Sequence, residues 1–150
     1  MNPTVEDRLK SLEDERDILK TLYTYGHALD YGLEAEFLDC FAHDADLYWA
    51  TPEPIHGRAA LANAFRSHTH APATYHKHLL IEPRIKVQGD GAVVESMFAR
   101  LDRYADGPRI RSFGRYLDIM ERGLDNRWRF KERRAEREAL IPDQPESWSR

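Results

Sequence analysis

Apolar residues in the first fifth of the chain recur at three- and four-residue steps, which is the spacing of one face of an α-helix. The members of this series are Leu9, Leu12, Ile18, Leu19, Leu22, Gly26 and Leu29. Thr4 and Asp7 stand at the positions of a capping box, with Asp in place of the usual Glu or Gln. We therefore predict a long amphipathic helix that ends near Asp30, with Gly32 as its terminator.

The next segment predicts two short helices with a strand between them. Residues 33–41 have a helical pattern, residues 45–50 resemble a strand, and residues 58–68 return to a helical pattern. Two prolines and a glycine break the chain between 52 and 57. The positions expected to face inward are Phe37, Leu38 and Phe41 in the first helix and Leu61, Ala64 and Phe65 in the second.

The second half of the chain predicts strands joined by tight turns. The expected strands are residues 76–87, 92–104, 109–121 and 127–138, and each of the three intervals between them contains both glycine and Asp. Helices followed by an antiparallel meander predict an α+β fold, with the helices packed on one face of a bent sheet. We expect residues 1–140 to form a single domain and residues 141–150 to be a flexible tail.

Composition narrows the class of protein. The chain has 150 residues, of which 41% are hydrophobic and 32% are charged, as expected for one globular domain. Its apolar runs are too short for a transmembrane helix. The first twenty residues hold six acidic side chains, unlike a signal peptide, and Cys40 is the one cysteine. We expect a cytoplasmic protein without a disulfide or a cysteine-based metal cluster.

The charge is distributed unevenly along the chain. Residues 1–50 hold twelve acidic and four basic side chains, whereas residues 100–137 hold seven acidic and twelve basic ones. The basic residues alternate with acidic ones, and no nucleic-acid-binding motif accompanies them. The pattern favours a charged outer strand face or a subunit contact over nucleic-acid binding.

The densest group of chemically reactive side chains is four histidines, His68, His70, His76 and His78. His76 and His78, followed by Glu82 and Gly89, reproduce most of the first metal-binding motif of cupins, and histidines two apart on a strand face the same side. However, no histidine follows His78, and His70 replaces the leading glycine. A metal site remains an alternative, and our main prediction includes no metal.

The order of several short motifs resembles the SnoaL-like branch of the nuclear transport factor 2-like superfamily, from about Glu6 to Arg137. The motifs are YGHALD at 25–30, FAHDAD at 41–46, IHGR at 55–58, TYHKH at 74–78, VQGDGA at 87–92, GRYLD at 114–118 and WRFKERR at 128–134. The resemblance implies a cone-shaped α+β barrel in which N-terminal helices cover a strongly curved, mainly antiparallel sheet around a pocket. It also implies a homotrimer.

Within this superfamily the chain resembles scytalone dehydratase, hexachlorocyclohexane dehydrochlorinase and bile-acid 7α-dehydratase. These enzymes place an aspartate at the end of the first helix and a histidine at the start of a strand, which correspond here to Asp30 and His78. A tyrosine of the bile-acid enzyme corresponds to Tyr25. On a helical wheel Tyr25 and Asp30 lie about 140° apart, so both can lean over one cavity, with Gly26 leaving room between them.

An aspartate–histidine pair suits proton abstraction from carbon. The carboxylate orients the imidazole and raises the basicity of its other nitrogen, while a phenol from Tyr25 or Tyr48 can donate to the leaving oxygen. The expected activity is that of a cofactor-independent, dehydratase-type lyase acting on a small hydrophobic, aromatic molecule. An isomerase, a cyclase or a non-catalytic binding module are the alternatives.

Each candidate also has a structural interpretation. Asp30 suits a helix end that faces solvent, His78 suits a half-buried strand, and Tyr25 suits the core. His68, His70 and His76 are expected on loops or at the rim of the pocket.

The residues expected to bind substrate combine aromatic and charged side chains. They are Tyr48, Phe65, Phe98, Asp102, Arg103, Phe113 and Arg133. The resemblance implies a polar residue on the second long strand. Counting along the family pattern without gaps gives Leu101, which is apolar, so the nearby Arg100, Asp102 and Arg103 are the candidates. Arg133 or Arg134 corresponds to an arginine beside the dyad of the dehydrochlorinase, and Arg115 is as compatible with a structural role as with a catalytic one.

Overall fold

The computed structural model describes residues 1–142, and its first element is the long helix α1 (Val5–Tyr31). The side chain of Thr4 accepts a hydrogen bond from the Asp7 backbone at 3.1 Å, and the Asp7 carboxylate accepts one from the Thr4 backbone at 2.9 Å. The helix ends at Gly32, whose φ of 74° suits glycine. Both predicted ends of this helix are therefore confirmed.

The elements that follow are α2 (Glu34–Asp39), β1 (Phe41–Trp49), β2 (Ile55–His56) and α3 (Gly57–Ser67). The strand β1 begins four residues earlier than we predicted, and Phe41 belongs to it rather than to the preceding helix. Phe41 pairs with Phe130 of a distant strand, and both side chains are buried. This pairing with a remote partner overrides the local helical pattern.

The second half of the chain forms β3 (His76–Gln88), β4 (Gly91–Tyr104), β5 (Gly107–Arg122) and β6 (Trp128–Leu140), each within two residues of its prediction. These four strands form the expected antiparallel meander. The described sheet has six strands in the order β2-β1-β6-β5-β4-β3, and β1 runs parallel to β6.

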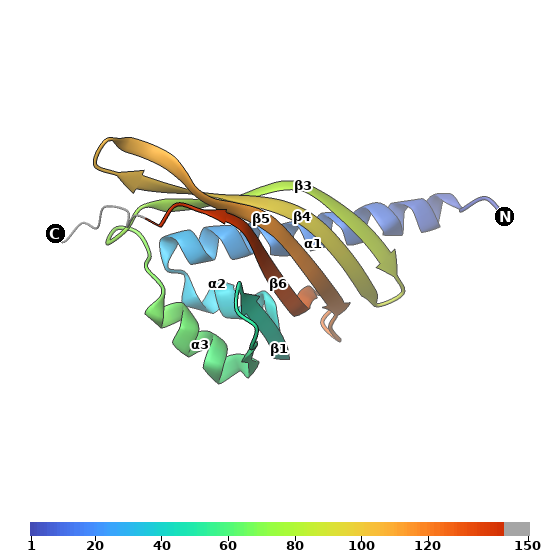
Figure 1. Cartoon of the computed structure of the whole chain (residues 1–150). Coiled ribbons are helices and arrows are strands. Elements are labelled where there is room, and N and C mark those ends of the chain that lie inside the picture. The colour runs from blue at the N-terminus through green and yellow to red at the C-terminus, as the bar shows by residue number, and fades with distance from the viewer. Residues whose placement is uncertain (143–150) are drawn as a thin grey trace.

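The sheet curves around the C-terminal half of α1 (Figure 1). Register shifts interrupt the β3–β4, β4–β5 and β5–β6 pairings, and such bulges bend strands. The N-terminal end of α1 projects beyond the sheet, and its residues 5–13 are exposed. The α+β class, with helices packed on a curved and mainly antiparallel sheet, is confirmed.

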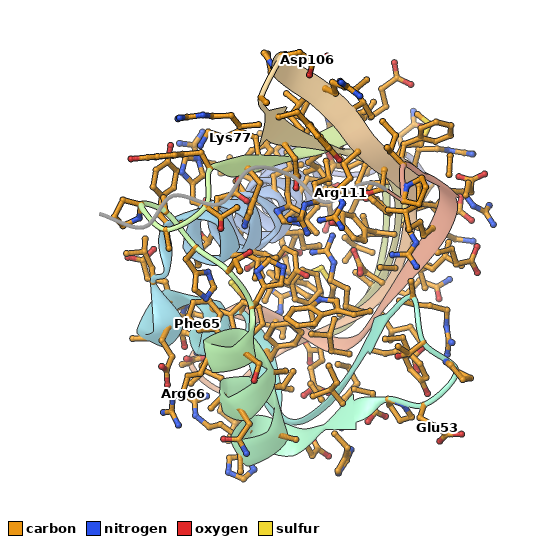
Figure 2. All side chains as sticks on the ribbon, turned by 60° about the vertical axis from the view of Figure 1, so that its left-hand side comes forward. Glu53, Phe65, Arg66, Lys77, Asp106 and Arg111 are labelled. Atoms are coloured by element: carbon orange, nitrogen blue, oxygen red, sulfur yellow. The ribbon has the colours of Figure 1, made fainter. Side chains whose placement is uncertain are left out.

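The core fills the space between the sheet and the three helices, where side chains crowd together in Figure 2. Its members include Ile18, Leu22, Tyr25, Leu29, Phe37, Phe41, Leu47, Leu61, Phe65, Met120, Trp128 and Phe130. Among the residues described, no helix combines the length and the apolar character needed to cross a membrane. Most of the predicted tail, residues 143–150, lies outside the described part of the chain.

Candidate functional site

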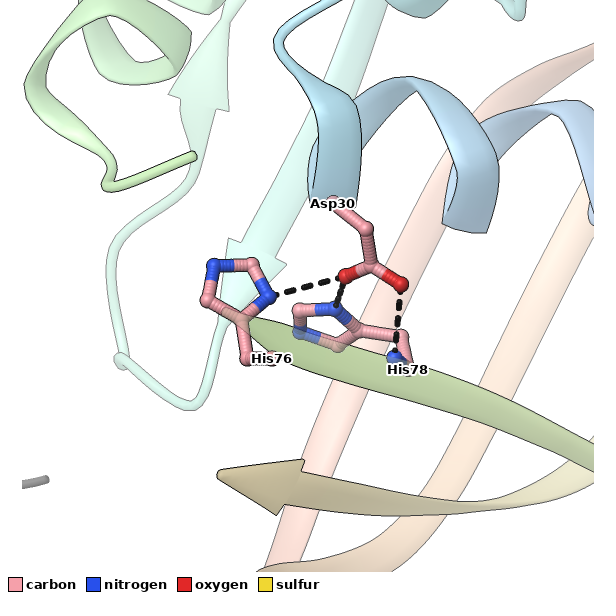
Figure 3. A group of neighbouring side chains, drawn as sticks. All are labelled: Asp30, His76 and His78. Atoms are coloured by element: carbon pink, nitrogen blue, oxygen red, sulfur yellow. Dashed lines mark hydrogen bonds and ion pairs between the residues drawn. The ribbon is translucent and has the colours of Figure 1, made fainter. Parts of the chain in front are cut away.

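Asp30 lies in the last turn of α1, is 4% exposed and accepts hydrogen bonds from two histidines of β3 (Figure 3). Its Oδ1 contacts His76 Nδ1 at 2.9 Å and His78 Nδ1 at 2.6 Å. Its Oδ2 accepts a bond from the backbone N–H of His78 at 3.0 Å. The carboxylate therefore ties the end of the helix to the start of the strand.

These contacts keep Asp30 ionised. Burial raises the pKa of Asp30, but hydrogen bonds from the His76 and His78 side chains and from the backbone N–H of His78 together outweigh burial. The net effect holds the pKa of Asp30 well below its ordinary value. A negative charge is thus fixed beneath the two imidazoles.

His78 has one engaged and one unengaged ring nitrogen. Because Nδ1 faces a carboxylate, Nδ1 carries the proton and Nε2 carries the lone pair. Within the described part of the chain, Nε2 contacts no hydrogen-bonding partner, and His78 lines two cavities. Burial lowers the pKa of His78 by more than the hydrogen bond and charge of Asp30 raise it, so the ring is neutral at pH 7. His78 is therefore equipped to accept a proton.

His76 was expected on a loop or at the rim, and that expectation is wrong. It is the first residue of β3 and is 2% exposed. Its Nδ1 contacts Asp30 and its Nε2 contacts the Thr69 carbonyl oxygen at 2.7 Å. Both ring nitrogens are therefore engaged, one by a carboxylate and the other by a backbone carbonyl oxygen. Having no unengaged nitrogen, His76 holds Asp30 in place and is unsuited to act as a base.

Two cavities meet beside the Asp30–His78 pair, which is called the dyad below. The larger has a volume of about 400 Å³ and lies between α1 and β3, where Leu22, Gly26, Asp30 and Leu80 are among its lining residues. The smaller has a volume of about 180 Å³ and is lined by residues including Trp49, His68, Phe98 and Arg100. Tyr25, His78 and Tyr116 line both cavities, so the two spaces adjoin at these side chains.

Tyr25 lies at this junction with its hydroxyl proton available. Its oxygen accepts a hydrogen bond from Trp49 Nε1 at 2.9 Å, which leaves the phenolic O–H free to donate. Burial raises the pKa of Tyr25, although the Arg133 guanidinium opposes this effect, so the phenol stays protonated at neutral pH. Tyr25 can therefore act as a proton donor.

Two of the predicted substrate-binding residues line a cavity. Phe98 lines the smaller one and stacks on Tyr116 with ring centroids 4.6 Å apart. Arg133 lines the larger one, with its guanidinium 4.2 Å from the Tyr25 ring and 3.7 Å from the Tyr116 ring. Arg133 Nε lies 3.5 Å from Asp118, a carboxyl whose pKa burial raises to about 6 despite the guanidinium.

Three predicted aromatic contacts lie outside both cavities. For Tyr48 and Phe113 the reason is strand register, because an error of one residue reverses the face of the sheet. Tyr48 is half-buried beside Arg134 outside both cavities, and its neighbour Trp49 faces the smaller one. Phe113 is 50% exposed on the outer face of β5. Phe65 is buried in the core, with its ring 4.7 Å from that of Phe37.

The two predicted charged contacts on β4 also line neither cavity. Asp102 is 1% exposed and binds Arg100 at 2.6 and 3.0 Å, so it supports the arginine that lines the smaller cavity. Arg103 lies over the Tyr75 ring at 5.8 Å. Arg100 was one of the alternatives that the sequence left open. The β4–β5 pairing shifts register between Arg100 and Leu101, which explains why an ungapped count along this strand arrived at Leu101.

The ligating atoms of Asp30, His76 and His78 all lie within 4.8 Å of one another, a spacing that can hold a metal ion. Here both ring nitrogens are directed at the same carboxylate oxygen, and hydrogen bonds account for each contact. The cupin-like alternative is wrong in its fold, because helices cover a single curved sheet. The donor set therefore fits a hydrogen-bonded network better than a cupin metal centre.

Comparisons with known proteins place this geometry in context. The function-unknown protein Rv3472 from Mycobacterium tuberculosis is 24% identical, with a TM-score of 0.78 over 88% of this chain and 80% of that chain. A putative scytalone dehydratase from Novosphingobium aromaticivorans is 21% identical, with a TM-score of 0.75 over 91% and 92%. An NTF2-like protein with a cystatin-like fold, also from Novosphingobium aromaticivorans, is 22% identical, with a TM-score of 0.76 over 96% and 94%.

These identities are low, so the solved structures establish the fold alone. A comparison with curated proteins found no match. The family model of the SnoaL-like domain matches residues 10–134, which is most of the chain. The fold of the SnoaL-like domain is found in small-molecule enzymes and small-molecule-binding proteins. The chain belongs to the SnoaL-like domain family.

Proposed function

We propose that this protein is a cofactor-independent lyase that eliminates a leaving group, such as water, from a small hydrophobic molecule. One observation carries the proposal. The buried, ionised Asp30 binds Nδ1 of His78, and Nε2 of that ring is left unengaged at the junction of two cavities. An imidazole held in this way is a general base that operates near neutral pH.

The elimination can be followed through the residues at the junction. His78 Nε2 takes a proton from carbon, and the electron pair of that C–H bond becomes a carbon–carbon double bond. The leaving hydroxyl departs as water, taking its proton from the Tyr25 O–H, and the phenolate is then reprotonated by the imidazolium of His78. Asp30 stays ionised throughout and stabilises that imidazolium, and base catalysis of this kind accelerates a reaction by about 10²–10⁴-fold.

The substrate class follows from the walls of the cavities. Leu22, Leu80, Phe98 and Tyr116 make them largely apolar and aromatic, and the volumes of about 400 and 180 Å³ suit a small molecule. The aromatic rings of Phe98 and Tyr116 in these walls support the choice of an aromatic substrate. An isomerase shares the proton-abstraction step, and a binding module would share the cavity alone.

The proposal predicts that His78→Gln abolishes turnover while the protein stays folded. Cyclic β-hydroxy ketones, alone or fused to an aromatic ring, would be screened for water loss with the purified protein, and circular dichroism would confirm folding of the variants. We expect a loss of at least about 10³-fold for His78→Gln, because the base is removed, and about tenfold for His76→Gln, which only positions Asp30.

Two results would count against the proposal. Full activity of His78→Gln would exclude that residue as the base. Stoichiometric binding of screened compounds without water loss or exchange of a carbon-bound proton with deuterated solvent would favour the binding module, whereas exchange without water loss would favour an isomerase.

A further inference from the structure

His68 borders the smaller cavity together with the proposed base, yet the proton transfers described above do not use it. It directly follows α3, and its backbone N–H bonds to the carbonyl oxygens of Ala64 and Phe65, each at 3.1 Å. Its ring centroid lies 5.4 Å from that of Trp49 and 6.1 Å from that of His78. The end of the helix therefore fixes a second imidazole in the wall of the same cavity.

The hydrogen bonds of His68 define its tautomer. Its Nδ1 lies 2.8 Å from the Thr69 carbonyl oxygen, which only accepts, so Nδ1 carries the proton. Its Nε2 then carries a lone pair, and that atom contacts no hydrogen-bonding partner in the described part of the chain. A half-buried acceptor without a partner is satisfied only by water or by a ligand that donates.

The surroundings of His68 keep this acceptor neutral. Burial, with help from the positive charge of Arg100, lowers the pKa of His68 to about 3, although the bond to Thr69 opposes the shift. Asp102 holds Arg100 through bonds of 2.6 and 3.0 Å. The ring is therefore an acceptor, and not an acid, at any pH near neutral.

The size of the cavity limits what can approach this acceptor. A cavity of about 150 Å³ lined by apolar residues accommodates benzene in another protein. The smaller cavity here, at about 180 Å³, is lined by Trp49, Phe98 and Tyr116 and therefore suits a single six-membered ring. Such a ring would carry its polar substituent toward His68.

We propose that His68 is a specificity-determining residue whose Nε2 accepts a hydrogen bond from a ring hydroxyl of the substrate, so that the protein selects hydroxylated aromatic or enolic rings. The inference rests on the proposed function in one respect, which is that this cavity binds the substrate. It adds a chemical requirement that the dyad does not impose, namely an O–H donor on the ring that enters beside Trp49.

The test compares two probes of similar size, phenol, which donates, and fluorobenzene, which does not. Dissociation constants would be measured by NMR titration of the folded protein, followed through the Trp49 indole signal. We expect the preference for phenol, given as the ratio of the two constants, to fall about tenfold in His68→Phe, with fluorobenzene binding little changed. His68→Leu makes the same test should the Phe variant fail to fold, and His43→Phe, at an exposed position of β1, is the matched control.

The inference is overturned if the ratio is unchanged in both His68 variants, if it falls equally in His43→Phe, or if phenol at millimolar concentration leaves the Trp49 signal of the wild type unmoved. The readout needs no turnover, so the two proposals fail separately. An unchanged ratio together with loss of turnover in His78→Gln removes only the hydroxyl requirement. A lowered ratio in a protein that turns over nothing removes only the lyase.

Discussion

At the scale of the residue, the site depends on one carboxylate shared by two histidines. The resemblance predicted Asp30 and His78, and strand alternation places His76 on the same face as His78. The sequence could not predict that His76 is buried, because the Thr69 carbonyl that occupies its Nε2 comes from a loop without a regular pattern. That loop decides which of the two imidazoles keeps an unengaged nitrogen.

The low pKa of Asp30 makes its contribution to stability depend on pH. Because the folded-state pKa lies below the ordinary value, the contribution is fully present above about pH 4 and is lost as the pH falls below that value. Asp30→Asn should lower the free energy of unfolding by about 2–3 kcal/mol at pH 7, since bonds to a charged acceptor are lost. The difference from the wild type should shrink below about pH 4.

Urea denaturation between pH 7 and pH 3 measures this difference. Asp17→Asn is the control, because Asp17 lies exposed on the same helix and should change stability little at any pH. A difference between wild type and Asp30→Asn that stays constant down to pH 3 would show that the carboxylate is not stabilised in the folded state.

At the scale of the element, patterning predicted the strands of the meander and the start and end of α1. It could not place the bulges, because a register shift depends on the facing strand and not on local sequence. The shift between Phe113 and Gly114 is one example, and the error over the face of Phe113 belongs to the same strand. At Gly114 the backbone of β6 approaches so closely that an added Cβ would lie 1.9 Å from the Glu136 carbonyl oxygen.

This close approach predicts that Gly114→Ala lowers the free energy of unfolding by about 3 kcal/mol or prevents folding. The clash is with backbone, which cannot rotate away. Gly91→Ala is a matched control at the start of β4, because its added Cβ would meet its nearest atom at 3.7 Å, an ordinary contact. Chemical denaturation of both variants measures the effect, and equal stability of the two would contradict the strand register described here.

At the scale of the whole molecule, the site is assembled from segments that are remote in the sequence. Asp30 comes from α1, Trp49 from β1, His68 from the end of α3 and His78 from β3. The order of motifs predicted the fold, but the parallel pairing of β1 with β6 brings Trp49 to the cavity, and no local pattern indicates that pairing. This is why the dyad was predictable and the walls of the cavity were only partly so.

The central claim is that Asp30 holds His78 as a neutral ring with its lone pair on Nε2. Long-range ¹⁵N–¹H NMR of histidine-labelled protein at pH 7 tests it most directly, because ring nitrogen shifts report the tautomer and no substrate is needed. The account predicts a protonated Nδ1 and an unprotonated Nε2 for His78. A His78 ring protonated on Nε2, alone or together with Nδ1, would contradict it.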